Sequence, residues 1–157
     1  MKKTAIPEDL AGFHVIVQVH IQWGDQDALG HVNNTVALRW FESSRVAYLE
    51  HCGCSHLMTG EVLGPILASV TCHYRRQLHY PDTVHVAARV QSLGRSSIRI
   101  QHRIYSEKLR AVAIDGESVV VVFNYQTQRP VRVPEAMRDA INQLEHAHPP
   151  GPSAAGG

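Results

Sequence analysis

The 157-residue sequence lacks an excess of charge of either sign and lacks long hydrophobic runs. It contains 15 lysines and arginines against 14 aspartates and glutamates, so no strong field exists to hold nucleic acid or an anionic membrane. It has no stretch of about 18 consecutive apolar residues, which argues against a membrane-spanning helix. Pro7, Glu8 and Asp9 interrupt an opening that otherwise imitates a secretory signal, so we expect no signal peptide.

Cysteine is also scarce, with Cys52, Cys54 and Cys72 as the three examples. An odd number in a chain long enough to fold without disulfide bonds favours reduced thiols and a cytoplasmic location. Two of the three lie in segment 51–56, His-Cys-Gly-Cys-Ser-His, which resembles a metal-binding cluster. Cys-x-Cys does not match the usual spacing of zinc ligands, however, and no second pair follows at the expected distance, so we expect no metal site.

Alternation of apolar and polar residues is the strongest pattern that the sequence does contain. Between His14 and Trp23 the odd positions are apolar, which predicts a strand with one buried face. The same period of two predicts three more strands, and a β-branched run predicts a fifth. These four lie over 66–74, 84–90, 98–104 and 109–125. In the last, we interpret Gly116 as a bulge within one long strand rather than as a hairpin turn.

A change to helical spacing predicts a helix of about five turns from Asn33 to Cys52. Asn33 or Asn34 offers an N-cap oxygen, and Gly53 follows where a left-handed residue is needed. A second helix is predicted over 134–146, because a proline stands at its first turn.

The chain length and its 44% hydrophobic content suit one compact domain. We place this domain at 13–147, after an N-terminal segment, 1–12. The tail, 148–157, is rich in proline, glycine, serine and alanine, which predicts disorder. Short connections between the strands require antiparallel pairing. The expected class is therefore α+β, with one long helix against a curved antiparallel sheet.

The loop between the first strand and the long helix concentrates residues able to do chemistry. A helix start offers unpaired N–H groups and a positive dipole end, which favour a developing anion. Asp27 lies a few residues earlier, where a carboxylate can activate water or attack a carbonyl while the amides bind the oxyanion. Residue types alone favour a simpler interpretation, in which Asp25, Asp27 and Gly30 shape a turn and Asn33 caps the helix.

Five segments carry a family resemblance. They read QWGDQDALGHVNN at 22–34, RWFE at 39–42, VTCHYRRQLHYPD at 70–82, LGRSS at 93–97 and RPVRVP at 129–134. Together they closely resemble the 4-hydroxybenzoyl-CoA thioesterase family of the hotdog-fold superfamily. The likeness covers nearly all of the chain apart from its ends.

This resemblance implies a hotdog fold, in which a strongly curved antiparallel sheet wraps around one long central helix. It implies hydrolysis of an acyl-coenzyme A thioester to free acid and coenzyme A, which is part of the substrate, so that no cofactor is expected. It also implies a homodimer whose two sheets join edge to edge, with active sites at the subunit boundary, and we favour pairing of such dimers into a tetramer.

Carried over by motif position, Asp27 corresponds to the catalytic acid of the family, as nucleophile or general base. The backbone of Asn33 and Asn34 corresponds to its oxyanion-binding helix start. His31 either orients the thioester or assists Asp27, or it only shapes the loop. One branch of the family has aromatic or histidine residues where Asn33 and Asn34 stand, which disfavours an aromatic acyl group here.

A second group of residues is expected to bind the coenzyme A part of the substrate. The hairpin residues Arg95, Ser96 and Ser97 lie in a region that approaches coenzyme A in the relatives, where they can meet phosphate or pantetheine. Arg75 and Arg76 can do the same. The alternative for each arginine is a solvated surface position.

Two other functions fit the same sequence. One is a hotdog dehydratase or hydratase of acyl thioesters, which would need a histidine and an acid paired across the dimer. The other is a non-catalytic acyl-coenzyme A binding module, since a fold alone does not fix function. The Asp-x-x-Gly-His-Val-Asn-Asn loop, which begins at Asp27, resembles the thioesterase branch better than either.

Overall fold

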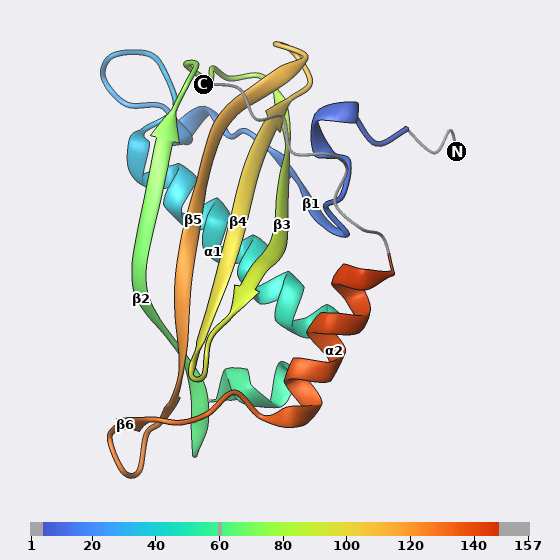
Figure 1. The fold of residues 1–157 in the computed structure, drawn as a ribbon. Coiled ribbons are helices and arrows are strands. Elements are labelled where there is room, and N and C mark those ends of the chain that lie inside the picture. The colour runs from blue at the N-terminus through green and yellow to red at the C-terminus, as the bar shows by residue number, and fades with distance from the viewer. Residues whose placement is uncertain (1–4, 60, 148–157) are drawn as a thin grey trace.

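The computed structural model describes residues 5–59 and 61–147. The predicted disorder of 148–157 lies outside these described residues. One antiparallel sheet curls around a long helix (Figure 1), which confirms the expected α+β class. The strand order is β1-β3-β4-β5-β2, and a short β6 pairs with β5. The strands are β1 (Val15–His20), β2 (Leu63–Tyr74), β3 (Thr83–Leu93), β4 (Ser97–Ser106), β5 (Ala111–Asn124) and β6 (Arg129–Pro130).

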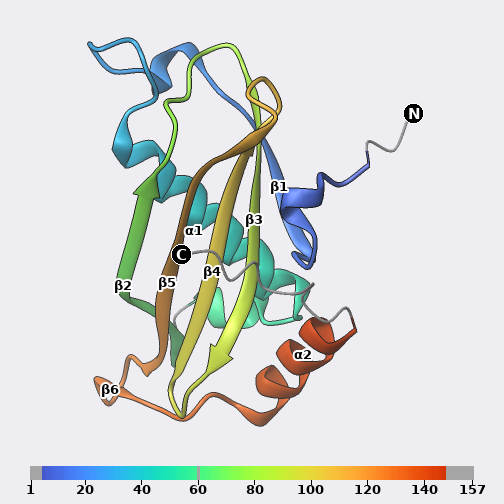
Figure 2. The same cartoon turned by 45° about the horizontal axis from the view of Figure 1, so that its top comes forward.

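Helix α1 (Asn34–His51) occupies the hollow of the sheet, and α2 (Glu135–His146) lies beside its far end (Figures 1 and 2). The ends of α1 are those predicted from the sequence, because the Asn33 side chain caps its first turn and Gly53 follows with φ 71°. One face of α1 packs on the sheet and forms the core with it. The buried residues of this face are Val36, Ala37, Trp40, Phe41, Ser44, Tyr48 and Leu49.

The first strand is shorter than predicted. β1 ends at His20, and the chain then forms a 3-10 turn at Trp23–Asp25. The Asp25 carboxylate accepts a hydrogen bond from the Gln22 amide at 2.8 Å, which closes this turn. Trp23 is 75% exposed, so its predicted place on the buried face of a strand is wrong.

Strand β2 forms as predicted but lies at the edge of the sheet, where it pairs with β5 alone. Its register shifts between Leu67 and Ser69, which leaves Ala68 as an extra residue and interrupts the alternation. Ile66 and Leu67 are 36% and 47% exposed. Of the apolar alternation in 66–74, Val70 and Cys72 are partly buried against the core, so this strand has only a partly buried face.

Strand β5 is one long strand, as predicted, but its irregularity lies at Ala113 and not at Gly116. A Cβ atom at Gly116 would lie 2.0 Å from the Thr71 carbonyl oxygen and 2.9 Å from a ring carbon of Phe41. Glycine is required here because β2 and α1 both approach the backbone of β5 closely.

The N-terminal segment packs on the sheet through Leu10 and Phe13, which form a small buried cluster with Ala87 of β3. Among the helices of the described residues, none combines the length and the apolar character that crossing a membrane requires.

Candidate active site

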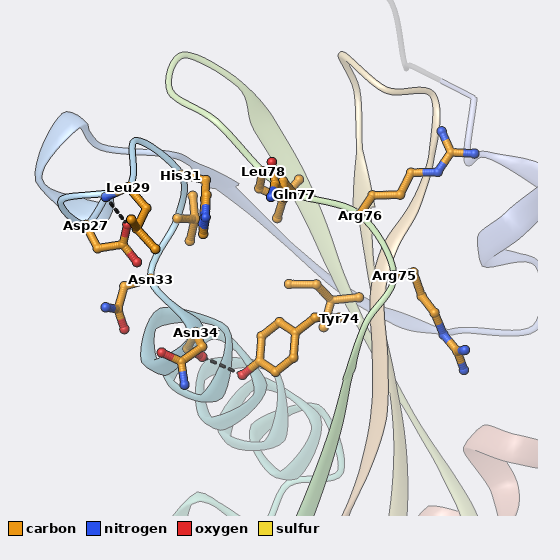
Figure 3. A pocket seen from close by; sticks show the side chains of 12 residues that line it. Asp27, Leu29, His31, Asn33, Asn34, Tyr74, Arg75, Arg76, Gln77 and Leu78 are labelled. Atoms are coloured by element: carbon orange, nitrogen blue, oxygen red, sulfur yellow. Dashed lines mark hydrogen bonds between the residues drawn. The ribbon is translucent and has the colours of Figure 1, made fainter.

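A cavity of about 470 Å³ opens between the loop before α1, the start of α1 and the segment that follows β2 (Figure 3). Six of the residues predicted as functional line it together: Asp27, His31, Asn33, Asn34, Arg75 and Arg76. The rest of its wall is mainly apolar and comes from Leu29, Val32, Tyr74, Gln77, Leu78 and Ile114. Segments more than 80 residues apart in the sequence thus meet at one end of the sheet.

The loop holds Asp27 in a tight turn. The Asp27 amide donates to the His31 carbonyl oxygen and the Gly30 amide donates to the Asp27 carbonyl oxygen, both at 3.0 Å. Gly30 has φ 81°, which only a glycine adopts without strain. The Asp27 Oδ1 atom accepts from the Leu29 amide at 2.9 Å. Its Oδ2 atom forms no hydrogen bond within the described residues, so this oxygen is uncommitted.

The segment between β2 and β3 forms hydrogen bonds to the loop that carries Asp27. The Val32 amide donates to the Leu78 carbonyl oxygen at 2.8 Å. The His79 Nδ1 atom lies 2.9 Å from the Gly30 carbonyl oxygen, which can only accept, so Nδ1 carries the proton. These contacts attach the Asp27 turn to the segment between β2 and β3. The position of Asp27 therefore depends on residues about 50 positions further along the chain.

The two neighbouring aspartates have different environments. The Asp25 carboxylate accepts from the Gln22 amide, and the Asp25 carbonyl oxygen accepts from the Asn33 amide at 2.9 Å. Asp25 is thus engaged in building the loop, as the simpler interpretation predicted for it. Asp27 also closes a turn, through Leu29, but unlike Asp25 it lines the cavity.

At the start of α1, one amide remains available. Asn33 Oδ1 accepts from both the amide and the hydroxyl of Thr35, at 2.9 and 2.7 Å. The Asn33 amide is itself engaged with Asp25. Within the described residues, the Asn34 amide donates to no acceptor. It is therefore the first-turn N–H group that is free to bind an anion.

Two residues of the site were missed from the sequence. Tyr74, at the end of β2, donates its hydroxyl proton to the Asn34 carbonyl oxygen at 2.6 Å. His79 holds the Asp27 turn and lies 6.3 Å from His31, ring centre to ring centre, at an edge-to-face angle of 89°. No local pattern in the sequence predicts either contact, because both join segments about 40 to 50 residues apart.

Arg75 and Arg76 line the cavity, but their side chains extend away from Asp27 (Figure 3). Arg75 forms an ion pair with Asp115 at 3.0 Å, and hydrogen bonding to that carboxylate raises the pKa of Arg75. Arg76 forms no ion pair with any described residue and is exposed. Of the two, Arg76 is therefore the arginine free to meet a phosphate at the outer rim.

The hairpin between β3 and β4, which carries Arg95, Ser96 and Ser97, lies at the opposite end of the sheet from the start of α1 (Figure 1). β3 runs from Thr83, next to the cavity end, to Leu93 at the hairpin. At a rise of about 3.3 Å per residue, the 11 residues from Thr83 to Leu93 separate the cavity end of the sheet from the hairpin by roughly 30 Å. A single chain thus does not bring these three residues to Asp27.

The cysteines offer no activated nucleophile. All three are free, and burial raises the pKa of each thiol, that of Cys52 to about 12. Because the thiolate is the reactive form, these thiols are poor nucleophiles at neutral pH. Within residues 5–59 and 61–147, no group of three histidine, cysteine, aspartate or glutamate side chains is arranged to hold a metal ion.

The curled sheet around one long helix is the hotdog fold, and comparisons with known proteins identify the family. The profile of the thioesterase-like superfamily matches residues 21–141 of this chain. The chain therefore belongs to the thioesterase-like superfamily. It is a thioester hydrolase, as the sequence resemblance implied.

Solved structures agree with this assignment. A thioesterase from Thermus thermophilus, crystallised with coenzyme A and zinc, is 35% identical with a TM-score of 0.77, covering 86% of this chain and 96% of that chain. A protein from Pseudomonas aeruginosa is 28% identical with a TM-score of 0.75, covering 85% and 92%. The DHNA-CoA thioesterase of Staphylococcus aureus is 20% identical with a TM-score of 0.76, covering 84% and 91%, and supports the fold alone.

Proposed function

We propose that this protein hydrolyses acyl-coenzyme A thioesters with Asp27 as the catalytic carboxylate and the Asn34 amide as an oxyanion donor. One observation carries the proposal: Asp27, which has an uncommitted carboxylate oxygen, and Asn34, whose amide is free, line the same cavity. An attacking group and an anion-binding group on one cavity wall are what acyl transfer requires.

Two routes use these groups. As a general base, Asp27 takes a proton from water, whose oxygen bonds to the thioester carbonyl carbon. The carbonyl oxygen then carries the negative charge, which the Asn34 amide stabilises. When the C–S bond breaks, the thiolate leaves with the electron pair and takes the proton from Asp27. As a nucleophile, Asp27 bonds to the carbonyl carbon itself, and the C–S bond breaks as the thiolate leaves with the electron pair. Water then hydrolyses the resulting anhydride, which releases the free acid and regenerates the Asp27 carboxylate.

Coenzyme A is the proposed thiol because the Thermus thermophilus relative was crystallised with coenzyme A bound. Arg76 lies at the rim of the cavity without an ion pair to any described residue, where a guanidinium can meet a phosphate. The apolar part of the wall, with Leu78 and Ile114 both 3% exposed, suits the acyl group.

The test is a panel of aliphatic and aromatic acyl-coenzyme A substrates with colorimetric detection of the released thiol. We expect wild-type protein to release thiol without added metal or cofactor. Asp27→Asn should lower kcat by about 10²- to 10⁴-fold, because it removes the attacking or proton-accepting group. Asp25→Asn is the matched control, since its carboxylate accepts a backbone hydrogen bond within the loop.

Asp25→Asn should keep kcat within about tenfold of wild type, because an amide oxygen can still accept that hydrogen bond. The reverse order of the two variants would refute the assignment of Asp27. A flat trace for wild-type protein across the whole panel would refute acyl-coenzyme A as the substrate class.

We further propose a homodimer joined through β2. This strand is 12 residues long, lies at the edge of the sheet and exposes Ile66 and Leu67. Such an edge presents unpaired backbone groups that favour another strand. Leu29, 80% exposed, adds apolar surface at the cavity, near the Tyr74 end of this strand. Pairing of β2 with its copy covers this edge and brings a second chain next to each cavity.

A further inference from the structure

Tyr74 connects the edge strand to the start of α1. It is the last residue of β2, and its ring crosses the cavity end to place the hydroxyl 2.6 Å from the Asn34 carbonyl oxygen (Figure 3). The backbone turns sharply directly after it, where the amides of Arg75 and Arg76 both donate to the Ala113 carbonyl oxygen at 2.9 and 3.0 Å. The phenol is therefore presented from a fixed point of the sheet.

The first turn of a helix is the part that most easily frays, because its amides have no acceptor within the helix. In α1 the upstream side is held by Asn33, whose Oδ1 accepts from Thr35. On the downstream side, the Tyr74 hydroxyl donates a hydrogen bond to the Asn34 carbonyl oxygen. Among the described residues, no side chain other than those of Tyr74 and the Asn33 cap forms a hydrogen bond to the backbone of this first turn.

We propose that Tyr74 is a positioning residue for thioester hydrolysis, whose hydroxyl keeps the Asn34 residue, and with it the free Asn34 amide, in place on the cavity wall. This inference rests on the proposed function. An oxyanion donor accelerates the reaction only if it is held in place before the charge develops. The hydrogen bond that Tyr74 makes is directed at the residue that carries the donor.

The hydroxyl stays a donor over the pH range in which a thioester is stable. Burial and hydrogen bonding with the Cys72 thiol raise the pKa of Tyr74 to about 12. The proton is therefore retained at neutral pH, and the hydrogen bond to Asn34 does not titrate there.

The experiment compares Tyr74→Phe with Tyr125→Phe. Each variant keeps its ring and loses one hydroxyl that donates to a backbone carbonyl oxygen. Tyr125 donates to Pro65 at 3.2 Å, near the other end of β2 and away from the cavity, so it is the matched control. We expect Tyr74→Phe to lower kcat by about 3- to 10-fold with KM within about twofold, and Tyr125→Phe to keep both values.

Amide hydrogen exchange, followed by mass spectrometry without substrate, supplies a second readout. Peptides covering 33–38 should exchange about 3- to 10-fold faster in Tyr74→Phe than in wild type and should be unchanged in Tyr125→Phe. Faster exchange throughout the chain would instead indicate general destabilisation and would overturn the inference. An equal loss of kcat in both tyrosine variants would also overturn the inference, because it would show that the effect is not specific to Tyr74.

Asp27→Asn, assayed beside these variants, separates the two proposals. If Asp27→Asn is inactive while Tyr74→Phe matches wild type in kcat and in exchange, this inference alone fails. If Asp27→Asn turns over at the wild-type rate, the proposed function fails, and the positioning role that depends on it fails as well.

Discussion

His102 is a completely buried imidazole in the middle of β4 with both ring nitrogens hydrogen bonded. Ser44 donates to the Phe41 carbonyl oxygen, so its oxygen accepts from Nδ1 of His102 at 2.9 Å. Nε2 then accepts from the Ser118 hydroxyl at 2.9 Å, and Arg45 donates to that same hydroxyl oxygen at 3.1 Å. The order of donors and acceptors requires neutral His102 with its proton on Nδ1.

This arrangement predicts a stability that depends on His102 in acid. Burial, and then the charge of Arg45, lower the pKa of His102 to about 3. As pH falls below about 6.5, the imidazole binds a proton in the unfolded chain but stays neutral in the folded protein. The contribution of neutral His102 to the free energy of unfolding is therefore complete above pH 6.5 and is lost toward pH 3. The free energy of unfolding should fall by up to about 1.4 kcal/mol per pH unit from this residue.

The measurement is urea unfolding at several pH values for wild type and His102→Gln. The glutamine variant should be less stable at pH 7 but should show a shallower acid slope, because it has no imidazole to protonate. His56→Gln, at an exposed position, is the control and should follow wild type. Identical slopes for all three proteins would contradict the assignment.

At the scale of elements, sequence patterns correctly predicted the features that depend on residues adjacent in the chain. The caps of α1 at Asn33 and Gly53 were predicted correctly, because capping depends on residues adjacent in sequence. The exposure of β2 was not predicted, because the alternation of a strand does not say whether the strand is central or at an edge. The Gly116 signal was recognised but attributed to a bulge, because its cause is contact with Thr71 and Phe41 from other elements.

The same division applies to the candidate site. The motif from Asp27 to Asn34 is continuous in sequence, and its residues do line one cavity. Tyr74 and His79 belong to the site through hydrogen bonds to that segment, and only the folded chain reveals such partners.

Gly116 gives a test at this scale. Gly116→Ala should destabilise the protein by about 3 kcal/mol, since the new methyl group would overlap the Thr71 carbonyl of the neighbouring strand. Gly24→Ala is the matched control, because no atom lies within 4 Å of the added methyl group there. The control should stay within about 0.5 kcal/mol of wild type in chemical denaturation. Equal stability of both variants would show that β2 is not held tightly against β5.

At the scale of the whole molecule, the proposed dimer would explain how distant site residues could act together. Asp27 and the hairpin residue Arg95 lie at opposite ends of the same sheet. Under two-fold symmetry, antiparallel pairing of β2 with its copy sets the cavity end of one subunit beside the hairpin end of the other. The proposed dimer can therefore unite the two groups that a single chain keeps apart, and Arg95, Ser96 and Ser97 then serve the cavity of the partner.

Mixed subunits test this sharing of residues. We expect Asp27→Asn to be inactive, and Arg95→Glu to raise KM for acyl-coenzyme A by about tenfold or more, because it places an acid against the phosphates. In a hybrid of the two variants, one site receives both substitutions and the other receives neither. Hybrids purified through two different affinity tags should recover about half of the wild-type activity at low substrate concentration.

The control for the hybrid is Asp27→Asn paired with itself under both tags, which should stay inactive. If Arg95 instead served the cavity of its own chain, each hybrid site would carry one substitution and no wild-type site would form. KM separates the two arrangements: shared sites give a hybrid with the wild-type KM, whereas sites within one chain give the raised KM of Arg95→Glu. The wild-type KM in the hybrid requires that the functional unit is the dimer, because Asp27 and Arg95 then act on one substrate from two chains.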